Sequence, residues 1–339
     1  MSNFKPFLTA AMSGDPLGND QMRDAMSALL SGDVSDIEIA AFLSALRTRG
    51  ETVDEIAAAA MAMRDKAIGV QIDHDIVDTC GTGGDGADTF NISTAAAIIA
   101  AGAGVRIAKH GNKAASSQSG SSQVLEALGV NIVIPPARIS ECVENARIGF
   151  MFAAAHHGAV AHVANVRKTM GVRTIFNVLG PLTNPAGARR QVMGVFSKDL
   201  VRPIAEAMPK LGVERAFVVH GSDGLDELTT TGETFVASLE DGKVHEFTIT
   251  PEDAGLKRAE LRDLKGGNPD ENAKAIKRIL AGEHGAFRDI AVLNAAASLV
   301  VAGSAKTLND GARLAEAAID NGKAAAALDT LIKISNAPS

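Results

Sequence analysis

Two glycine-rich turns are the features of this sequence best suited to bind a ligand. The first, residues 80–86 (Cys-Gly-Thr-Gly-Gly-Asp-Gly), follows the apolar run 76–79 and precedes an unbroken apolar segment at 95–101. The run predicts a buried strand and the segment predicts a helix. Ser93 or Thr94 would cap that helix and leave free backbone N–H groups directed at the turn. A strand, a turn whose glycines let the main chain approach a ligand, and a capped helix together predict an anion site, most often for phosphate.

The same arrangement is repeated directly downstream. Residues 105–108 predict the next strand, residues 109–112 (Lys-His-Gly-Asn) form its turn, and residues 124–128 predict the following helix. Lys109 supplies a positive charge, and five serines supply hydroxyl donors: Ser116, Ser117, Ser119, Ser121 and Ser122. Neither turn has the dinucleotide fingerprint or the Walker pattern, so neither NAD nor a nucleoside triphosphate is indicated. Two phosphate-type turns in tandem predict a ligand with two separate anionic groups.

An acidic pair, Asp226 and Glu227, follows a predicted strand at 215–219 and a glycine-containing loop. The carboxyl end of a strand is where α/β proteins place their ligands. Taken alone, such a pair is best interpreted as a solvated acidic turn. Beside two phosphate turns it favours a magnesium site, because Mg²⁺ is commonly held by one or two carboxylates together with substrate phosphates.

Other residues able to do chemistry give weaker patterns. The spacing of His110, His156, His157 and His162 fits no zinc site, and Cys80 and Cys142 lie far apart, so we interpret these histidines as hydrogen-bonded structural groups. No Gly-x-Ser-x-Gly elbow supports a serine nucleophile. Arg167 and Lys168 lie in a helical pattern, where such cations usually face solvent. Arg167 would hold a substrate carboxylate only if it faced the cleft.

Composition narrows the class of partner. The 339 residues are 46% hydrophobic and 22% charged, as in ordinary globular proteins, and 33 Lys and Arg against 40 Asp and Glu give a net charge of −7. The chain therefore has no overall positive charge that would attract nucleic acid, and the absence of Tyr and Trp disfavours stacking on bases. No apolar stretch reaches membrane length, no signal peptide is recognised, and only two cysteines occur, so we expect a cytoplasmic protein.

The hydrophobic pattern divides the chain into two parts. Residues 1–72 predict a small helical bundle with capping boxes at Ser35 and Thr52. Its wide apolar faces indicate packing against another surface. That surface could be the chain's own α/β part, but we favour a homodimer interface. Residues 73–339 alternate strands and helices, which predicts an α/β domain with a mostly parallel central sheet flanked by helices.

Three local predictions follow within the α/β part. Residues 131–134 read as a strand, and Asp241-Gly242 as a two-residue hairpin turn. Residues 171–187 are dense in Pro and Gly, which predicts irregular structure with a functional role. A helical insertion near 157–187 is expected to pack on the helical domain.

Residues 81–85 with residues 89–94 resemble the first signature of the anthranilate phosphoribosyltransferases of tryptophan biosynthesis. The other signatures of that family correspond to residues 109–112 with 119–121, residues 166–167 with 173–185, and the pair Asp226 and Glu227. The similarity extends over almost the whole chain. It implies a small helical domain joined to an α/β domain similar to that of nucleoside phosphorylases, paired as a homodimer through the helical domain.

The resemblance also implies an activity and a set of roles. The enzyme would transfer phosphoribosyl from phosphoribosyl diphosphate to the amine of anthranilate and release diphosphate, with two Mg²⁺ ions per monomer. The residues implied to bind phosphoribosyl diphosphate are Gly81, Gly83, Gly84, Asp85, Thr89, Asn91, Ser93, Thr94, Lys109 and Ser121. Those implied to bind anthranilate are Gly81, Asn112 and Arg167, and those implied to bind metal are Ser93, Asp226 and Glu227. No general base is assigned, because the aniline-type nitrogen is neutral at pH 7 and needs orientation.

Three positions depart from the family pattern. Gln118 stands where Lys or Arg is usual, Gln123 where Asp is common, and Gly158 where Pro follows the histidine. Losing a cation beside the phosphate turn would weaken phosphoribosyl diphosphate binding by about 1–3 kcal/mol if that cation contacts the ligand.

Two alternative functions compete with this one. A pyrimidine nucleoside phosphorylase of the same fold would need neither Asp226 and Glu227 nor residues 173–185. A non-catalytic relative that binds nucleic acid is disfavoured by the net charge and the intact acidic pair.

Overall fold

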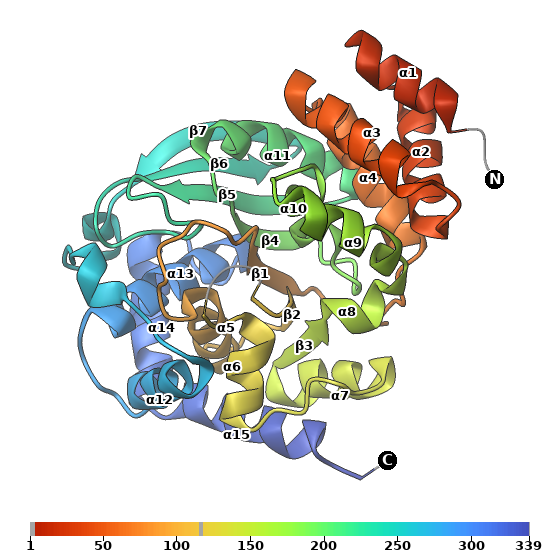
Figure 1. Ribbon diagram of the computed structural model, residues 1–339. Coiled ribbons are helices and arrows are strands. Elements are labelled where there is room, and N and C mark those ends of the chain that lie inside the picture. Colours follow the sequence, from red (N-terminus) through yellow and green to blue (C-terminus); the bar gives the residue numbers. More distant parts are fainter. Residues whose placement is uncertain (1–3, 115–117, 339) are drawn as a thin grey trace.

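A seven-stranded sheet forms the centre of the α/β part in the computed structural model, which describes residues 4–114 and 118–338 (Figure 1). The strand order is β3-β2-β1-β4-β5-β6-β7; the first five strands are parallel and the last two antiparallel. The strands are β1 (Val77–Gly81), β2 (Ile107–Gly111), β3 (Ile148–Phe152), β4 (Arg190–Gly194), β5 (Arg215–Gly221), β6 (Thr234–Glu240) and β7 (Lys243–Ile249). The predicted mostly parallel sheet is confirmed.

Helices cover both faces of the sheet, and the pleat assigns alternate side chains to two cores. Val192 and Val219 pack on one face against helices that include α5 (Ile92–Gly102) and α13 (Ala286–Ala302). Their neighbours Met193 and Val218 pack on the other face with the N-terminal bundle and α11 (Val201–Ala207). The first face is covered by α5 (Ile92–Gly102), α6 (Ser121–Leu128), α12 (Pro269–Leu280), α13 (Ala286–Ala302), α14 (Leu308–Asp320) and α15 (Lys323–Ser335). The remaining helices of the α/β part are α7 (Pro136–Ala146), α8 (Ala153–His156), α9 (Ala161–Met170), α10 (Phe176–Leu179) and α11 (Val201–Ala207).

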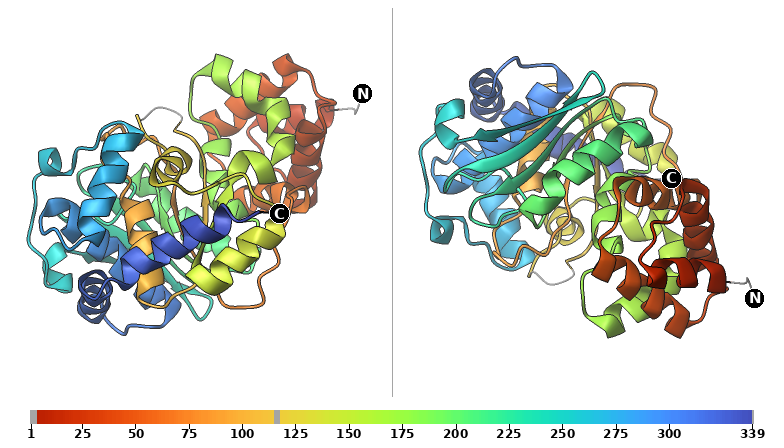
Figure 2. Two further views of the ribbon diagram at one scale, coloured as in Figure 1. Left: turned by 90° about the horizontal axis from the view of Figure 1, so that it is seen from below. Right: turned by 90° about the horizontal axis from the view of Figure 1, so that it is seen from above.

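Four helices at the N-terminus form a bundle that projects from the sheet body (Figures 1 and 2): α1 (Lys5–Ser13), α2 (Asn19–Ser31), α3 (Asp36–Arg49) and α4 (Val53–Asp65). Both predicted capping boxes are present. The Ser35 hydroxyl accepts from the Glu38 N–H, and the Thr52 hydroxyl accepts from the Glu55 N–H. The later helix α9 packs against α2 and α3, so the bundle core includes residues from the middle of the chain.

The two-residue hairpin is confirmed. Asp241 and Gly242 connect β6 to β7 with φ of 50° and 72°, the positive values that a tight type I′ turn requires. Short 3₁₀ turns connect other elements: Gly158–Val160, Pro181–Thr183, Lys198–Leu200, Met208–Leu211, Pro251–Ala254 and Leu261–Leu264.

Three local predictions are wrong. Residues 131–134 form no strand, because their N–H groups bond to side chains, Asn131 to Ser335 and Val133 to Asn131. Residues 171–187 are not irregular throughout, since α10 and the turn Pro181–Thr183 lie within them. The N-cap of α5 is Asn91 instead of Ser93 or Thr94, and the side chain of Asn91 makes no capping bond.

Within residues 4–114 and 118–338, every helix is too short or too polar to cross a lipid bilayer.

Candidate active site

The chain reverses its order of strand addition at β1. From β1 it adds β2 and β3 on one side and later β4 and β5 on the other, so the carboxyl ends of β1 and β4 border a crevice of the kind that binds ligands in open α/β sheets. Gly81 ends β1 and Gly194 ends β4. A Cβ on Gly81 would lie 2.3 Å from Oδ2 of Asp226, and one on Gly194 would lie 1.5 Å from the Asp226 carbonyl oxygen. Both positions therefore require glycine so that the 221–233 loop can enter the crevice.

The acidic pair lies against the first glycine-rich turn. Oδ2 of Asp226 accepts the Gly83 N–H at 2.6 Å, and Oε1 of Glu227 accepts the Ser93 N–H at 3.2 Å. Burial, together with repulsion from Glu227 and Asp85, raises the pKa of Asp226 well above its usual value. Burial raises the pKa of Glu227 to about 7 despite the attraction of Lys109 and the hydrogen bonds from Ser93. The two carboxylates of the pair thus lie near enough to Asp85 and Lys109 to feel the charge of both.

Lys109 lies near the carboxyl end of β2 and is almost fully buried. Its Nζ donates to the Thr79 carbonyl, and burial lowers its pKa. The buried carboxylate of Asp78 lies nearby and accepts the His110 N–H at 3.1 Å, and burial raises the pKa of Asp78. Lys109 therefore lies close enough to the acidic pair to offset part of its negative charge.

The donor set of this crevice fits magnesium. Hard carboxylate oxygens are the ligands that Mg²⁺ prefers, and the raised pKa values indicate a shortage of positive charge. Among the described residues, no three His, Cys, Asp or Glu side chains converge as a complete ligand set. This matches the usual binding of Mg²⁺ by one or two carboxylates plus substrate phosphates.

Side-chain hydrogen bonds join the segments at the beginnings of α5 and α6, which follow the two turns. Ser121, the first residue of α6, donates its hydroxyl to the Asn112 carbonyl at 3.3 Å. Asn91 bonds Ser119 twice: its Nδ2 donates to the Ser119 carbonyl at 3.0 Å, and its Oδ1 accepts the Ser119 hydroxyl at 2.9 Å. Ser116 and Ser117 lie outside the described residues, Gln118 is exposed, and Gln123 accepts the Gly120 N–H at 3.0 Å.

The remaining residues of the first turn have distinct surroundings. Gly84 has a positive φ of 76°, and its carbonyl accepts from Arg173, whose guanidinium stacks on Phe196. Asp85 accepts the Ala87 N–H at 3.2 Å. Thr89 pairs with Lys265 in an isolated β-bridge, and the hydroxyl of Thr94 is buried with no partner among the described residues.

Arg167 lies apart from these groups, on α9. Its guanidinium is 5.0 Å from the ring centre of Phe176, and burial lowers its pKa. None of the hydrogen bonds or ion pairs among the described residues joins it to either turn. The structure therefore brings the phosphate turns, Lys109 and the acidic pair together. The Arg167 guanidinium lies apart from them, over the ring of Phe176.

Two histidines that the sequence indicated only as structural groups each have one ring nitrogen without a partner among the described residues. The rings of His110 and His157 lie 5.1 Å apart, and Nδ1 of His110 bonds the Gly180 carbonyl at 3.1 Å. Nε2 of each ring is buried without a partner among the described residues. Burial lowers the pKa of His110 to about 3 and that of His157 to about 4, so both rings are neutral at pH 7. The sequence signal was their position, near the carboxyl end of β2 and directly after α8.

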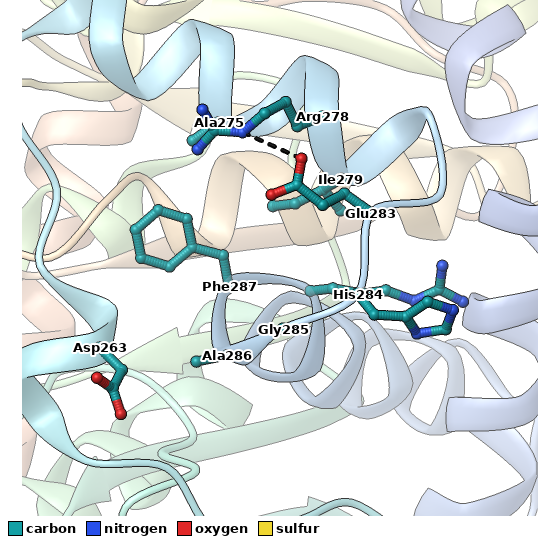
Figure 3. Close-up of a pocket in the computed structure, with 10 residues that line it drawn as sticks. Asp263, Ala275, Arg278, Ile279, Glu283, His284, Gly285, Ala286 and Phe287 are labelled. Atoms are coloured by element: carbon teal, nitrogen blue, oxygen red, sulfur yellow. Dashed lines mark ion pairs between the residues drawn. The ribbon is translucent and has the colours of Figure 1, made fainter.

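Two surface hollows lie away from the crevice. One, of about 140 Å³, lies between α12 and α13, where Figure 3 shows the Arg278–Glu283 ion pair (3.3 Å) and the ring of Phe287. The other, of about 450 Å³, is lined by residues of β5, β6 and the end of α13, among them Phe217, and by Lys306 after that helix. Neither is lined by a predicted site residue.

Comparison with known proteins accounts for this arrangement. Residues 5–67 match the helical bundle domain of a glycosyl transferase family, and residues 73–325 match its α/β domain. The chain is 53% identical to an anthranilate phosphoribosyltransferase of Parvibaculum lavamentivorans over 99% of this chain and 98% of that one. It is 54% identical to another from Phenylobacterium zucineum, over 98% of each. The chain belongs to the anthranilate phosphoribosyltransferase family.

Solved anthranilate phosphoribosyltransferases have the same fold. The Thermus thermophilus enzyme superimposes with a TM-score of 0.93 at 45% identity and covers 98% of this chain and 99% of its own. The Saccharomyces cerevisiae enzyme, solved in complex with PRPP (phosphoribosyl diphosphate) and Mg, superimposes with a TM-score of 0.90 at 30% identity over 98% of each chain. The sequence resemblance and the predicted fold class are both confirmed.

Proposed function

We propose that this chain transfers the phosphoribosyl group of phosphoribosyl diphosphate to the amine of anthranilate and releases diphosphate, the second pathway-specific step of tryptophan biosynthesis. The observation that carries the proposal is the excess of negative charge at the crevice, where Asp226 and Glu227 lie close to Asp85 with Lys109 as the buried cation, beside two glycine-rich turns. Such a site needs a cation, and a magnesium diphosphate supplies one together with the anion that the turns would bind.

The two turns would hold the phosphoribosyl diphosphate. Backbone N–H groups of the first turn and of the beginning of α5 would bind the diphosphate, and Ser121 with the beginning of α6 would bind the 5′-phosphate. The N–H of Gly83 is occupied by Asp226 in this structure, so we expect Asp226 to release it when the cation binds. The proposed ligand residues are Gly81, Gly83, Gly84, Asp85, Thr89, Asn91, Ser93, Thr94, Lys109 and Ser121.

Magnesium would be held by Asp226, Glu227 and Ser93, with two ions per monomer. Support comes from the contact between Ser93 and Glu227 and from the raised pKa values of both carboxyl groups. When bound, Mg²⁺ would neutralise the charge that develops on the departing diphosphate.

Anthranilate would bind between the second turn and the α9 side, held by Gly81, Asn112 and Arg167. The guanidinium of Arg167, free of carboxylates in the described chain, suits the substrate carboxylate. Nε2 of His110 carries a lone pair because Nδ1 donates to Gly180, and it could accept a hydrogen bond from the substrate amine. With a pKa of about 3, His110 would orient this amine without acting as a strong base.

The chemistry follows from positioning and charge. The bond from C1 of the ribose to the diphosphate oxygen breaks with its electron pair leaving on oxygen, and C1 becomes oxocarbenium-like. The amine lone pair then forms the new C–N bond, and the ammonium product loses a proton to solvent. The chain would contribute the backbone amides, Lys109 and the aligned amine, so that the reactants meet in a productive geometry.

We also propose a homodimer formed through the helical domain, residues 1–72. The support is the exposure of two large apolar side chains on the bundle surface, Met12 at 69% and Ile37 at 82%. Replacement of Ile37 by Lys should convert a dimer to a monomer in sedimentation velocity. A cytoplasmic location remains a prediction from the sequence.

The decisive experiment is loss of anthranilate fluorescence on mixing the protein with phosphoribosyl diphosphate. Loss that requires Mg²⁺ is the expected result. A folded protein that leaves the fluorescence unchanged at several Mg²⁺ concentrations would overturn the proposal, and phosphorolysis of a pyrimidine nucleoside would then be assayed.

A further inference from the structure

A buried asparagine on α12 contacts the phosphate site from behind. Asn272 is 2% exposed, and both the oxygen and the nitrogen of its carboxamide make hydrogen bonds. Its Oδ1 accepts the Gly267 N–H at 2.8 Å, and its Nδ2 donates to Oδ1 of Asn91 at 2.9 Å. The bond to an N–H identifies Oδ1 of Asn272 as the acceptor, so the group that faces Asn91 must be the donor.

This donor fixes the orientation of Asn91. Oδ1 of Asn91 accepts from Asn272 and from the Ser119 hydroxyl, while its Nδ2 donates to the Ser119 carbonyl. A flipped Asn91 amide would direct its NH₂ group at the Asn272 donor and its oxygen at the Ser119 carbonyl, losing the bonds to both. Asn272 therefore selects the one orientation in which Asn91 connects the beginning of α5 to Ser119, in the segment between the second phosphate turn and α6.

The segment that precedes α12 holds the same region from the backbone. The Phe90 N–H donates to the Leu264 carbonyl, and the Gly266 N–H donates to the Asp88 carbonyl. A Cβ on Gly266 would lie 2.6 Å from Phe90 backbone atoms, so the two backbone segments approach each other as closely as glycine allows. Phe90 also stacks on Phe287 at 4.3 Å between ring centres. The α12 side is therefore a rigid support, and Asn272 is its polar contact to Asn91.

We propose that Asn272 is a positioning residue for phosphoribosyl diphosphate: it acts through Asn91 to hold the two phosphate turns at the spacing the ligand requires. This inference rests on the proposed function. It adds a residue far along the chain that touches neither substrate. Its loss should weaken phosphoribosyl diphosphate binding selectively, because Arg167 and Asn112 do not contact it.

The test compares Asn272→Ala and Asn272→Asp with the wild-type enzyme at pH 8. Asn272→Ala removes the donor without adding charge. Asn272→Asp retains the acceptor for Gly267 but, when ionised, places an oxygen opposite Oδ1 of Asn91. We expect the KM for phosphoribosyl diphosphate to rise about tenfold or more in both variants, with the KM for anthranilate within about twofold of wild type. Calorimetric binding of phosphoribosyl diphosphate with Mg²⁺, in the absence of anthranilate, should weaken by the same factor.

A double-mutant cycle with Asn91→Ala tests whether the effect passes through Asn91. In that background Asn272→Ala should change the dissociation constant by less than about twofold. An equal tenfold loss in both backgrounds, or a lower melting temperature with both KM values unchanged, would overturn the inference. Asn321→Asp, an exposed change between α14 and α15 that retains the acceptor for the Lys323 N–H, controls for added charge. Failure of the wild-type protein to bind phosphoribosyl diphosphate would instead overturn the proposed function.

Discussion

Buried carboxylates occur in both parts of this molecule, and their pKa values are shifted in opposite directions. In the bundle, Glu55 is fully buried. Its carboxylate accepts hydrogen bonds from Nη2 of Arg49 at 2.5 Å and from the backbone N–H groups of Leu17 and Thr52 at 2.9 Å each. Burial alone would raise its pKa, but the hydrogen bonds from Arg49, Thr52 and Leu17 outweigh burial and lower it. At the crevice, burial prevails, and the pKa values of Asp226 and Glu227 are raised.

The difference lies in the supply of positive charge and donors. Glu55 has its own arginine and several donors, so its ionised form is stable within the fold. Asp226 and Glu227 repel each other and Asp85, with Lys109 as the nearby cation. A satisfied buried carboxylate supports the structure, whereas an unsatisfied group of them indicates a place where a ligand must complete the charge balance. Four experiments test this contrast.

The largest effect is expected from neutralising the crevice. Asp226→Asn and Glu227→Gln should each lower kcat/KM by about 10²–10³-fold, because the proposed magnesium contact is lost. Melting temperature should stay the same or rise, since a repulsion is removed. Steady-state kinetics and calorimetric melting measure the two effects, with Asp329→Asn on the exposed face of α15 as the control. Full activity in both variants would contradict the assignment of the acidic pair.

The reverse result is expected at Glu55. Glu55→Gln leaves Arg49 without its partner and should lower the free energy of unfolding by about 3 kcal/mol. Below the melting transition, KM and kcat should match wild type, because Glu55 lies in the bundle. Urea unfolding monitored by circular dichroism gives the first quantity. An unchanged unfolding midpoint would show that the Arg49 contact contributes little to stability.

Arg49 and Arg167 extend the comparison to cations. Arg49 is bound to a carboxylate, whereas Arg167 stacks on Phe176 and has no ion pair among the described residues. Arg167→Ala should raise the KM for anthranilate about 10–100-fold and leave that for phosphoribosyl diphosphate nearly unchanged. Arg167→Lys should recover only part of this loss, because it cannot form a bidentate contact. Equal weakening of both substrates would refute the proposed role.

The smallest effect is in the pH dependence of stability without metal. Glu227 has a pKa raised from 4.5 to about 7, so the folded state holds the extra proton in that window and stability falls as pH rises through it. Glu55 has a lowered pKa, so its contribution is lost as pH falls below its unfolded value. Between pH 5 and 7.5, wild type should lose a few degrees of melting temperature relative to Glu227→Gln. Parallel curves for the two proteins would contradict the raised pKa.

Local sequence signals accounted for much of the fold. Capping boxes and the Asp241-Gly242 hairpin depend on neighbours in sequence, and both are as predicted. Residues 131–134 were mistaken for a strand because their apolar pattern does not reveal that the N–H groups bond to Ser335 and Asn131. The wrong cap at Ser93 or Thr94 has a similar cause, since the group that accepts the Ser93 N–H at the beginning of α5 comes from the distant Glu227.

The candidate site was predictable in its residue types but not in its connections. The turns and the acidic pair are visible as motifs. Contacts between distant segments are not: Asp226 occupying the Gly83 N–H, Lys109 directed at Thr79, and Asn272 bonding Asn91. Nothing in the residues around Asn272 distinguishes it from an ordinary helical asparagine. Only the tertiary fold places its donor behind the phosphate turns.

The packing of α9 against α2 and α3 has a consequence for synthesis on the ribosome. The first four helices emerge early, but Val163 and Val166, which complete their core, are made only after β3. The bundle therefore keeps an uncovered apolar surface while β1, β2 and β3 are translated. Nascent chains stalled before residue 160 should be the ones that chaperones hold and proteases cut, and stalling beyond the last strands should abolish that sensitivity.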